Sequence, residues 1–230
     1  MKKILITGAN RGLGLEHTRR FVERGVFVYA TARTPSEADE LNELARTHPQ
    51  FVQVLAYDAL DAEAPAKLKA ELGNIALDLV FFNAGASGAR PPLGNIDAQV
   101  ALQLFQINAL APLKLAEALV ENVARSERKI LAFQSSLMGS ISDNGSGGAY
   151  AYRISKCALN MAVKYIAIDL REQGVIAVAL HPGRVKTRMG GVQAPLALAE
   201  SVQGQQQLLF NLTKAQSGGF FNYDGQLLPW

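Results

Sequence analysis

The sequence predicts an α/β protein: one doubly wound domain over residues 1–230, with about seven strands in a mostly parallel sheet and helices on both faces. Short apolar runs rich in β-branched residues alternate along the chain with longer amphipathic stretches, which is the order that repeated βαβ units produce. Some of the short runs, such as Val175–Leu180, contain no polar residue, and such strands are typical of a sheet covered on both sides. No Pro- or Ser-rich linker, composition shift or repeat divides the 230 residues.

The strands are predicted from the apolar runs in chain order. The first leads directly into a glycine-rich turn, and the fourth is followed by a loop over Gly85–Pro92. The expected strands are Lys3–Thr7, Val26–Ala32, Phe51–Tyr57, Leu77–Asn83, Lys129–Ser135, Val175–Leu180 and a short last strand, Gly219–Tyr223.

The helices are predicted between these strands, where apolar residues recur with helical spacing. Gly25 ends the first helix and Gly73 the third, because glycine readily adopts the left-handed conformation that follows many helices. The second is charged and amphipathic, and a bend is expected in the fourth at Pro112. The expected helices are Leu13–Arg24, Glu37–Thr47, Ala62–Leu72, Ala98–Val123, Tyr150–Glu172 and Ala197–Lys214.

Composition narrows the classes of function. The chain is 49% hydrophobic and 19% charged, as in ordinary globular proteins. Its 23 basic and 20 acidic residues are scattered, so no nucleic-acid partner is expected, and no apolar run is long enough to predict a membrane partner. The single cysteine, Cys157, permits no internal disulfide, which fits a reducing, cytoplasmic compartment. The three histidines lie far apart without metal-ligand spacing, so no metal is expected.

The turn after the first strand predicts a dinucleotide site. It reads Thr7-Gly8-Ala9-Asn10-Arg11-Gly12-Leu13-Gly14, with the spacing Gly-x-x-x-Gly-x-Gly between a strand and a helix. Glycines let the backbone turn sharply and approach a pyrophosphate, whose charge then lies at the helix N-terminus. A purely structural glycine turn is the alternative. The residues expected to bind the dinucleotide here are Gly8, Asn10, Arg11, Gly12, Leu13 and Gly14.

The end of the second strand indicates which dinucleotide binds. NAD sites usually place an acidic residue there for the ribose hydroxyls, but this strand ends Tyr29-Ala30-Thr31-Ala32-Arg33 without a carboxylate. Arg33 and Arg11 instead suit a clamp on a 2′-phosphate, since guanidinium matches phosphate geometry. Two solvated surface arginines are the alternative. We therefore expect NADP(H) in preference to NAD(H).

A candidate catalytic pair lies on the fifth predicted helix. Tyr152 and Lys156 are four residues apart, so their side chains share one helix face. An ammonium beside a phenol favours the phenolate and lowers a pKa that is normally about 10. Tyr152 is therefore a candidate general acid toward a carbonyl, or general base toward an alcohol.

With these motifs, the sequence resembles the short-chain dehydrogenase/reductase family over essentially its whole length. The motifs that occur in the family's order are the glycine turn, Asp58, Asn83-Ala84-Gly85, Asn108, Ser135-Ser136, Tyr152-x-x-x-Lys156 and Pro182-Gly183-x-Val185-x-Thr187. Three further segments look like the C-factor/Sniffer-type carbonyl reductase branch: Gly139-Ser140-Ile141, Gly147–Arg153 and Gly218–Gly225.

The resemblance implies a Rossmann fold and an NADPH-dependent oxidoreductase that transfers a hydride to a carbonyl, reversibly with the alcohol. It implies that Tyr152 donates the proton and that Lys156 binds the nicotinamide ribose and lowers the pKa of Tyr152. Ser136 would hydrogen-bond the substrate carbonyl, and Asn108 would hold a helix distortion and a water that relays protons through Lys156.

The same resemblance assigns the remaining cofactor contacts. Asp58 would bind the adenine, Asn83 and Gly85 would line the adenosine ribose, and Val185 and Thr187 would contact the carboxamide. The cofactor-binding set also includes Ala59, Ala84, Pro182 and Gly183.

The chain departs from the family pattern at two points. Phe82 stands where many relatives have an Asn before Asn83, which removes a polar contact that stabilises the sheet. The usual serine-to-tyrosine interval falls on Gly139, so Ser136 is the candidate catalytic serine. The rival serines are Ser135, Ser140 and Ser142.

Two other functions compete with carbonyl reduction. One is an NADP(H)-binding signalling or sensor module with little turnover, although such modules commonly lose the tyrosine or the lysine. The other is a sugar-nucleotide epimerase or dehydratase, whose relatives usually have a larger C-terminal domain and a Gly-x-x-Gly-x-x-Gly turn.

The expected partners are a small carbonyl or alcohol (an aldehyde, ketone or quinone on the oxidised side) and further copies of the chain. Relatives usually form homodimers or homotetramers through the two long helices. Pocket walls are expected from Ser87–Asn95, Ser140–Ala149 and Arg188–Leu196. The amphipathic segment Leu196–Leu209 is either a substrate lid or an oligomer contact.

Overall fold

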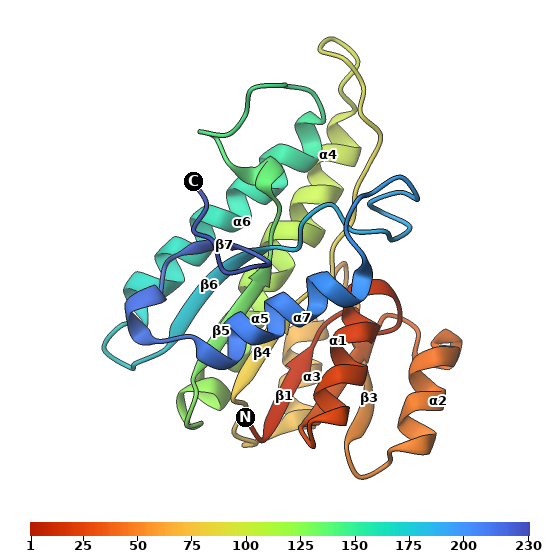
Figure 1. Cartoon of the computed structure of the whole chain (residues 1–230), viewed down its shortest axis with the longest axis vertical. Helices are drawn as coiled ribbons and strands as arrows, with labels where there is room; N and C mark the ends of the chain where they lie inside the picture. The colour runs from red at the N-terminus through yellow and green to blue at the C-terminus, as the bar shows by residue number, and fades with distance from the viewer.

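The computed structural model describes all 230 residues. Seven strands form one sheet in the order β3-β2-β1-β4-β5-β6-β7, and every neighbouring pair runs parallel (Figure 1). The strands are β1 (Lys3–Ile6), β2 (Phe27–Ala32), β3 (Val52–Ala56), β4 (Leu79–Phe82), β5 (Ile130–Gln134), β6 (Ile176–His181) and β7 (Phe220–Asn222). The helices are α1 (Gly12–Glu23), α2 (Asp39–Thr47), α3 (Ala64–Leu72), α4 (Ala98–Phe105), α5 (Ala111–Ala124), α6 (Tyr150–Asp169) and α7 (Leu198–Asn211). The doubly wound α/β fold expected from the sequence is confirmed.

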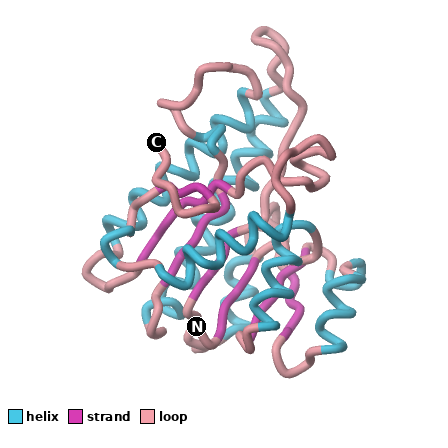
Figure 2. Tube along the Cα trace, viewed as in Figure 1, coloured by secondary structure: helices cyan, strands magenta, loops and turns pink.

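The strand β1 shows how the sheet separates two cores. Ile4 and Ile6 belong to the core under α1, α2 and α7, whereas Leu5 belongs to the core under α3, α5 and α6. Figures 1 and 2 show the strands between these two layers of helices. All three side chains are fully buried, and each such burial contributes about 1.5–3 kcal/mol. This is why strands without polar residues require helices on both faces.

The long helix expected over residues 98–123 is interrupted before the predicted bend at Pro112. After α4, residues Gln106–Leu110 form a π-helical segment, and α5 then begins with Pro112 in its first turn. Proline has no N–H to donate one turn back, and a π-segment is one way to accommodate that loss. The distortion therefore lies at Asn108, on the N-terminal side of the proline.

Several other helix ends differ from expectation. Pro35–Glu37 form a separate 3₁₀ turn, so α2 begins at Asp39, and α3 begins at Ala64. The helix α6 ends at Asp169, three residues early, and α7 ends at Asn211.

The segment Leu196–Leu209 places its apolar face in the core of the chain. Its apolar residues Val202 and Leu209 are fully buried, and α7 packs against α1 on one face of the sheet. The amphipathic pattern is accounted for by the core of the chain itself.

The strand order creates a crevice beside β1. The chain passes from β3 at one edge to β4 on the other side of β1, so the connections after β1 and β4 run to opposite faces. Loops after β4, β5 and β6 project from the same end of the sheet (yellow, green and light blue in Figure 1). Ligands of open α/β sheets bind at such a switch point.

No helix combines the length and the apolar character that crossing a bilayer requires. Nowhere do three His, Cys, Asp or Glu side chains gather as potential metal ligands. Cys157 is a free, half-buried thiol.

Candidate active site

The glycine turn leaves the start of α1 open to an anion. Gly8 has φ +64°, and a Cβ at Gly14 would lie 2.3 Å from the Gly8 carbonyl oxygen. Only glycine at position 14 therefore lets α1 approach the turn this closely. No side chain caps the N-terminus of α1 and its first turn has no acidic residue. Its free N–H groups and positive helix dipole suit a pyrophosphate.

Asn83 holds the glycine turn against the end of β4. Its side-chain nitrogen donates to the Thr7 and Gly8 carbonyl oxygens at 2.9 and 3.0 Å, and the Thr7 hydroxyl accepts from the Ala84 N–H at 3.0 Å. The resemblance implied a ribose contact for Asn83. The structure gives its amide nitrogen a different task, which is to shape the turn.

Arg11 and Arg33 lie at the carboxyl ends of the neighbouring strands β1 and β2. Arg11 is the residue before α1, and Arg33 directly follows β2. Both are exposed, and neither guanidinium takes part in an ion pair or a side-chain hydrogen bond. No carboxylate follows β2 before Glu37. Two unpaired guanidiniums without a competing acid suit a phosphate monoester.

Asn108 joins the π-helical segment to the loop after β4. Its side-chain oxygen accepts from the Ala86 N–H and its side-chain nitrogen donates to the Ala86 carbonyl, both at 2.8 Å. The same nitrogen donates to the Ser155 hydroxyl at 3.0 Å. The helix distortion expected at Asn108 is present, and its side chain is committed to protein partners.

Ser155 links Asn108 to α6, the helix that contains Tyr152 and Lys156. Its hydroxyl donates to the Tyr152 carbonyl at 2.8 Å while accepting from Asn108. Ser155 was not among the residues predicted from the sequence. Its position directly before Lys156 is the only sequence signal that marks it.

Ser136 and Tyr152 face each other where β5 ends and α6 begins. Burial raises the pKa of Tyr152 above its usual value, and the Ser136 hydroxyl and the Arg90 guanidinium each lower it in part. The Ser136 oxygen also accepts from the Met138 N–H at 3.2 Å, which caps a 3₁₀ turn. A hydroxyl and a phenol that face each other in this way can both donate to one carbonyl oxygen.

Lys156, one helical turn after Tyr152 on α6, is buried. Its ammonium donates to the Gln134 carbonyl at 2.7 Å, and burial lowers its pKa from 10.5 to about 8. A Cβ at Gly85 would lie 3.6 Å from the ammonium nitrogen. The implied lowering of the Tyr152 pKa by Lys156 is not seen here: the Tyr152 pKa is raised, because burial outweighs the groups that lower it.

The rival serines are placed differently. Ser135 donates to the Asn160 side chain of α6 at 2.5 Å. Ser140 accepts from the Asp143 N–H at 3.1 Å within its own turn, and Ser142 is exposed. Of the four, only Ser136 acts on the Tyr152 phenol.

The remaining predicted cofactor residues lie at the same end of the sheet, after the carboxyl ends of the strands. Asp58 and Ala59 directly follow β3 and are half-buried, and Asp58 accepts from the Leu60 N–H at 3.0 Å. Thr187 reaches back toward the glycine turn, so that a Cβ at Gly12 would lie 3.9 Å from its methyl group. The loop after β6 contains four of the predicted cofactor-binding residues: Pro182, Gly183, Val185 and Thr187.

Two arginines near Tyr152 were missed from the sequence. Arg153 donates to the Gly147 carbonyl, the Met138 carbonyl and the Ser146 hydroxyl at 3.2, 3.3 and 2.9 Å. It therefore ties the loop after β5 to the start of α6. Arg90 lies in the loop after β4, close enough to the phenol to lower its pKa. The sequence marks Arg153 only as the last residue of the Gly147–Arg153 segment, without a task of its own, and Arg90 belongs to no motif.

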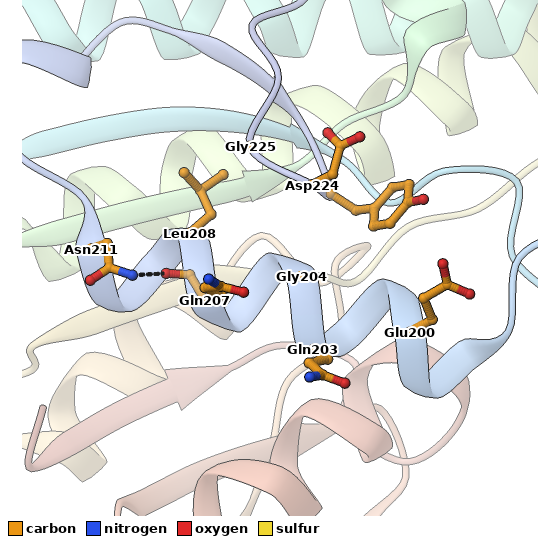
Figure 3. Close-up of a pocket in the computed structure, with 9 residues that line it drawn as sticks. Glu200, Gln203, Gly204, Gln207, Leu208, Asn211, Asp224 and Gly225 are labelled. Atoms are coloured by element: carbon orange, nitrogen blue, oxygen red, sulfur yellow. Dashed lines mark hydrogen bonds between the residues drawn. The ribbon is translucent and has the colours of Figure 1, made fainter.

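A hollow on the surface lies away from these residues. A depression of about 500 Å³ separates α7 from the turn after β7, with the carboxylates of Glu200 and Asp224 on its two sides (Figure 3). Asn211 donates to the Gln207 carbonyl along its wall at 2.8 Å. None of the predicted site residues lines it. We therefore place the active site at the crevice beside β1.

Comparison with known proteins agrees with this geometry. A family model for short chain dehydrogenases matches residues 2–195. The chain is 43% identical over 154 residues to the C-signal protein of Myxococcus xanthus, covering 67% of this chain and 93% of that protein. The carbonyl reductase Sniffer of D. melanogaster superposes with a TM-score of 0.95 at 37% identity over 100% of both chains. An NADPH-bound carbonyl reductase from chicken fatty liver superposes with a TM-score of 0.93 at 32% identity, over 100% of this chain and 99% of that one.

The fold, the crevice and these matches define the class. The chain belongs to the short-chain dehydrogenase/reductase family of NAD(P)-binding oxidoreductases. Within that family it lies in the C-factor/Sniffer branch, as the two similarities at 43% and 37% identity show.

Proposed function

We propose that this protein is an NADPH-dependent carbonyl reductase that converts a small aldehyde, ketone or quinone to the alcohol, and that the reaction is reversible. The observation that carries the proposal is the Ser136 hydroxyl facing the Tyr152 phenol, with the buried ammonium of Lys156 one helical turn further along α6. The two carbonyl reductases among the similar structures support it. The lone thiol of Cys157 suits a reducing cytoplasm.

The residues at the carboxyl ends of the strands suit the proposed cofactor. The open N-terminus of α1 would hold the pyrophosphate, and Arg11 and Arg33 would hold the 2′-phosphate that distinguishes NADP(H). The NADPH bound to the chicken liver relative supports the same preference. When bound, the cofactor supplies the hydride that the carbonyl carbon accepts.

The chain's own residues would handle the proton. Ser136 donates to the carbonyl oxygen and stabilises its developing negative charge. Tyr152 transfers its phenolic proton to that oxygen, so that one hydride and one proton convert the carbonyl to the alcohol. The Lys156 ammonium, one helical turn further along α6, would return a proton from solvent to the phenolate.

Replacing Tyr152 tests this mechanism. Tyr152→Phe should lower NADPH oxidation with an accepted aldehyde, ketone or quinone by about 100-fold or more, since positioned proton transfer contributes about 10²–10⁴-fold. NADPH binding, followed by fluorescence, should remain. Tyr150→Phe is the matched control and should retain activity. Full turnover by Tyr152→Phe would refute the mechanism.

The similarity to the C-signal protein motivates a second candidate, an NADP(H)-binding signalling module with little turnover. The presence of Tyr152, Lys156, Ser136 and Asn108 in one connected site argues for catalysis. A wild-type protein that binds NADPH tightly but oxidises it with no member of a broad carbonyl panel would establish the module instead.

We also propose that a second copy of the chain covers the outer surface of α4–α6. Large apolar side chains there are 37–61% exposed, namely Leu102, Phe105, Leu110, Leu113, Ile154, Met161, Tyr165 and Ile168. Such a concentration is typical of interfaces. Light scattering should show a homodimer or homotetramer that Ile154→Glu/Tyr165→Glu dissociates, whereas Val192→Glu on a distant loop should not. A monomeric wild type would contradict the proposal.

A further inference from the structure

The loop after β5 enters α6 through a left-handed turn (the green loop before α6 in Figure 1). Gly147, Gly148 and Ala149 have φ values of +62°, +67° and +48° in succession. L-residues avoid this region because the Cβ comes too close to the following carbonyl oxygen, and residues that do enter it usually occur singly. Ala149 has a Cβ and is buried. Such a strained run persists only where the surrounding structure holds it.

Arg153 makes the contacts that hold this turn. Its Nε donates to the Gly147 carbonyl at 3.2 Å and its Nη2 donates to the Ser146 hydroxyl at 2.9 Å. Its backbone N–H donates to the Ala149 carbonyl at 2.9 Å. The turn begins α6, and Tyr152 is the third residue of that helix. The position of the phenol therefore depends on the direction in which this turn starts the helix.

The third bond of the same guanidinium reaches the segment that holds Ser136. Arg153 Nη1 donates to the Met138 carbonyl at 3.3 Å, and the Met138 N–H donates to the Ser136 hydroxyl oxygen at 3.2 Å. Met138 is thus held through both of its peptide groups. Because the Ser136 oxygen accepts from Met138, its own O–H remains free to donate to a carbonyl.

Hydrogen bonds rather than burial fix the path of the loop between these two points. All residues from 141 to 148 are exposed, and segments with few buried contacts are easily displaced. The 3₁₀ turn before them lies directly on α6, where a Cβ at Gly139 would be 2.8 Å from the Lys156 carbonyl carbon. Arg153 links this anchored turn to the far end of the exposed loop.

We propose that Arg153 is a positioning residue for the reaction: by binding Met138 and the left-handed turn at once, it holds the Ser136 hydroxyl and the Tyr152 phenol at the separation that suits one carbonyl oxygen. The inference rests on the carbonyl reductase function proposed above. In this role Arg153 contacts neither substrate nor cofactor. Its loss lets the two donors move apart, and a misplacement of about 1 Å can cost about 100-fold in rate.

The experiment compares Arg153→Ala with Arg128→Ala in the reduction of 4-nitrobenzaldehyde and 9,10-phenanthrenequinone by NADPH. Arg153→Ala should lower kcat by about 10- to 100-fold, while KM and the Kd of NADPH stay within about three-fold of wild type. Arg128 is the matched control because it is also half-buried and also binds three backbone or side-chain oxygens, but at the other end of β5. Its partners are the carbonyls of Leu209, Phe210 and Leu212. Arg128→Ala should lose stability in urea and keep kcat.

Arg153→Lys separates the bridge from the charge. Its single ammonium keeps the positive charge but cannot reproduce the planar fork of donors, so it reaches only one end of the loop. We expect a kcat between those of wild type and Arg153→Ala, and this variant decides the proposal if Arg153→Ala does not fold. A wild-type kcat in Arg153→Lys would show that the bridge is dispensable.

The position of Tyr152 can also be followed without turnover. In NMR spectra of protein with ring-labelled tyrosine, the resonance that Tyr152→Phe removes should shift in Arg153→Ala and stay in place in Arg128→Ala. An unshifted resonance, an equal loss of kcat in Arg128→Ala, or a loss confined to KM would overturn the proposal. A wild type that reduces no carbonyl would refute the proposed reductase function, whereas the tyrosine resonance would still decide whether Arg153 positions Tyr152.

Discussion

Asn108 and Ala86 exchange two hydrogen bonds of 2.8 Å, one in each direction between the Asn108 side chain and the Ala86 peptide. This pair joins the π-helical segment to the loop after β4, and a third bond from Asn108 reaches Ser155 on the catalytic helix. One side chain thus fixes the cofactor-side loop and the helix of Tyr152 relative to each other.

Asn108→Ala should therefore lose activity and stability together. Leaving the half-buried Ala86 peptide unpaired costs about 1–3 kcal/mol of unfolding free energy, and we expect kcat to fall by about ten-fold or more because Tyr152 loses its support. Asn122→Ala is the matched control, since Asn122 is equally buried and donates to the Gly73 and Ile75 carbonyls away from the site. Denaturation should show similar losses for both variants, but kcat should fall only for Asn108→Ala. Equal kcat values would contradict the role given to this residue.

Gly14→Ala should abolish dinucleotide binding. Its Cβ would lie 2.3 Å from the Gly8 carbonyl oxygen and 2.6 Å from the Asn83 side-chain nitrogen, so the turn must open. Gly25→Ala is the control, because its Cβ meets nothing within 4 Å and only its φ of +71° is unfavourable. Calorimetric titration with NADPH should show binding by Gly25→Ala alone. Normal binding by Gly14→Ala would mean that the turn is not the pyrophosphate site.

Arg33→Ala and Arg11→Ala should each reduce the preference for NADPH over NADH. Removing a guanidinium that binds a phosphate costs about 1.5–3 kcal/mol, so the ratio of the two Kd values should fall by about 10- to 100-fold per variant. NADH has no 2′-phosphate, so its Kd should change little. Arg46→Ala, on the surface of α2, serves as the control. An unchanged ratio in both variants would show that the arginines are merely solvated.

NADPH affinity should weaken as the pH rises through about 8. Burial lowers the pKa of Lys156 to about 8, so its ammonium is charged below that pH and loses its attraction for the anionic cofactor above it. The raised pKa of Tyr152 keeps the phenol protonated over this range. Lys156→Arg should remove the pH dependence, because the guanidinium stays charged. A wild-type Kd that is constant from pH 7 to 10 would rule out this role for the ammonium.

The fold should lose stability in acid because His17 is buried without charge. Burial lowers the pKa of His17 to about 3, while the unfolded chain titrates near 6.5. Between these values only the unfolded state takes up the proton, so the unfolding free energy falls as the pH drops, by up to about 1.4 kcal/mol per pH unit. His17→Gln should flatten that slope in urea denaturation at pH 7, 6 and 5. His48→Gln, at the surface end of α2, should leave the slope unchanged, and an identical slope in His17→Gln would exclude His17 as its source.

Much of the architecture follows from local patterning. The apolar runs predict all seven strands because a parallel sheet buried on both faces excludes polar residues. The interruption of the helix at Asn108 was expected only from the family resemblance, since the apolar pattern continues through the π-segment. The amphipathic pattern of Leu196–Leu209 predicted a lid or an interface, because periodicity identifies an apolar face without showing what it packs against.

The sequence by itself determined the sheet, the glycine turn and the Tyr152–Lys156 pair, because each depends on residues that are close in the chain. Only the tertiary structure decided which serine faces the phenol, since Ser135 and Ser136 are neighbours with different partners on α6, the first bonded to Asn160 and the second beside Tyr152. It also decided the hydrogen-bond partners of Asn83 and Ser155. Their partners lie up to 76 positions away along the chain, and only the packing of loops at one edge of the sheet brings those groups within hydrogen-bonding or electrostatic range.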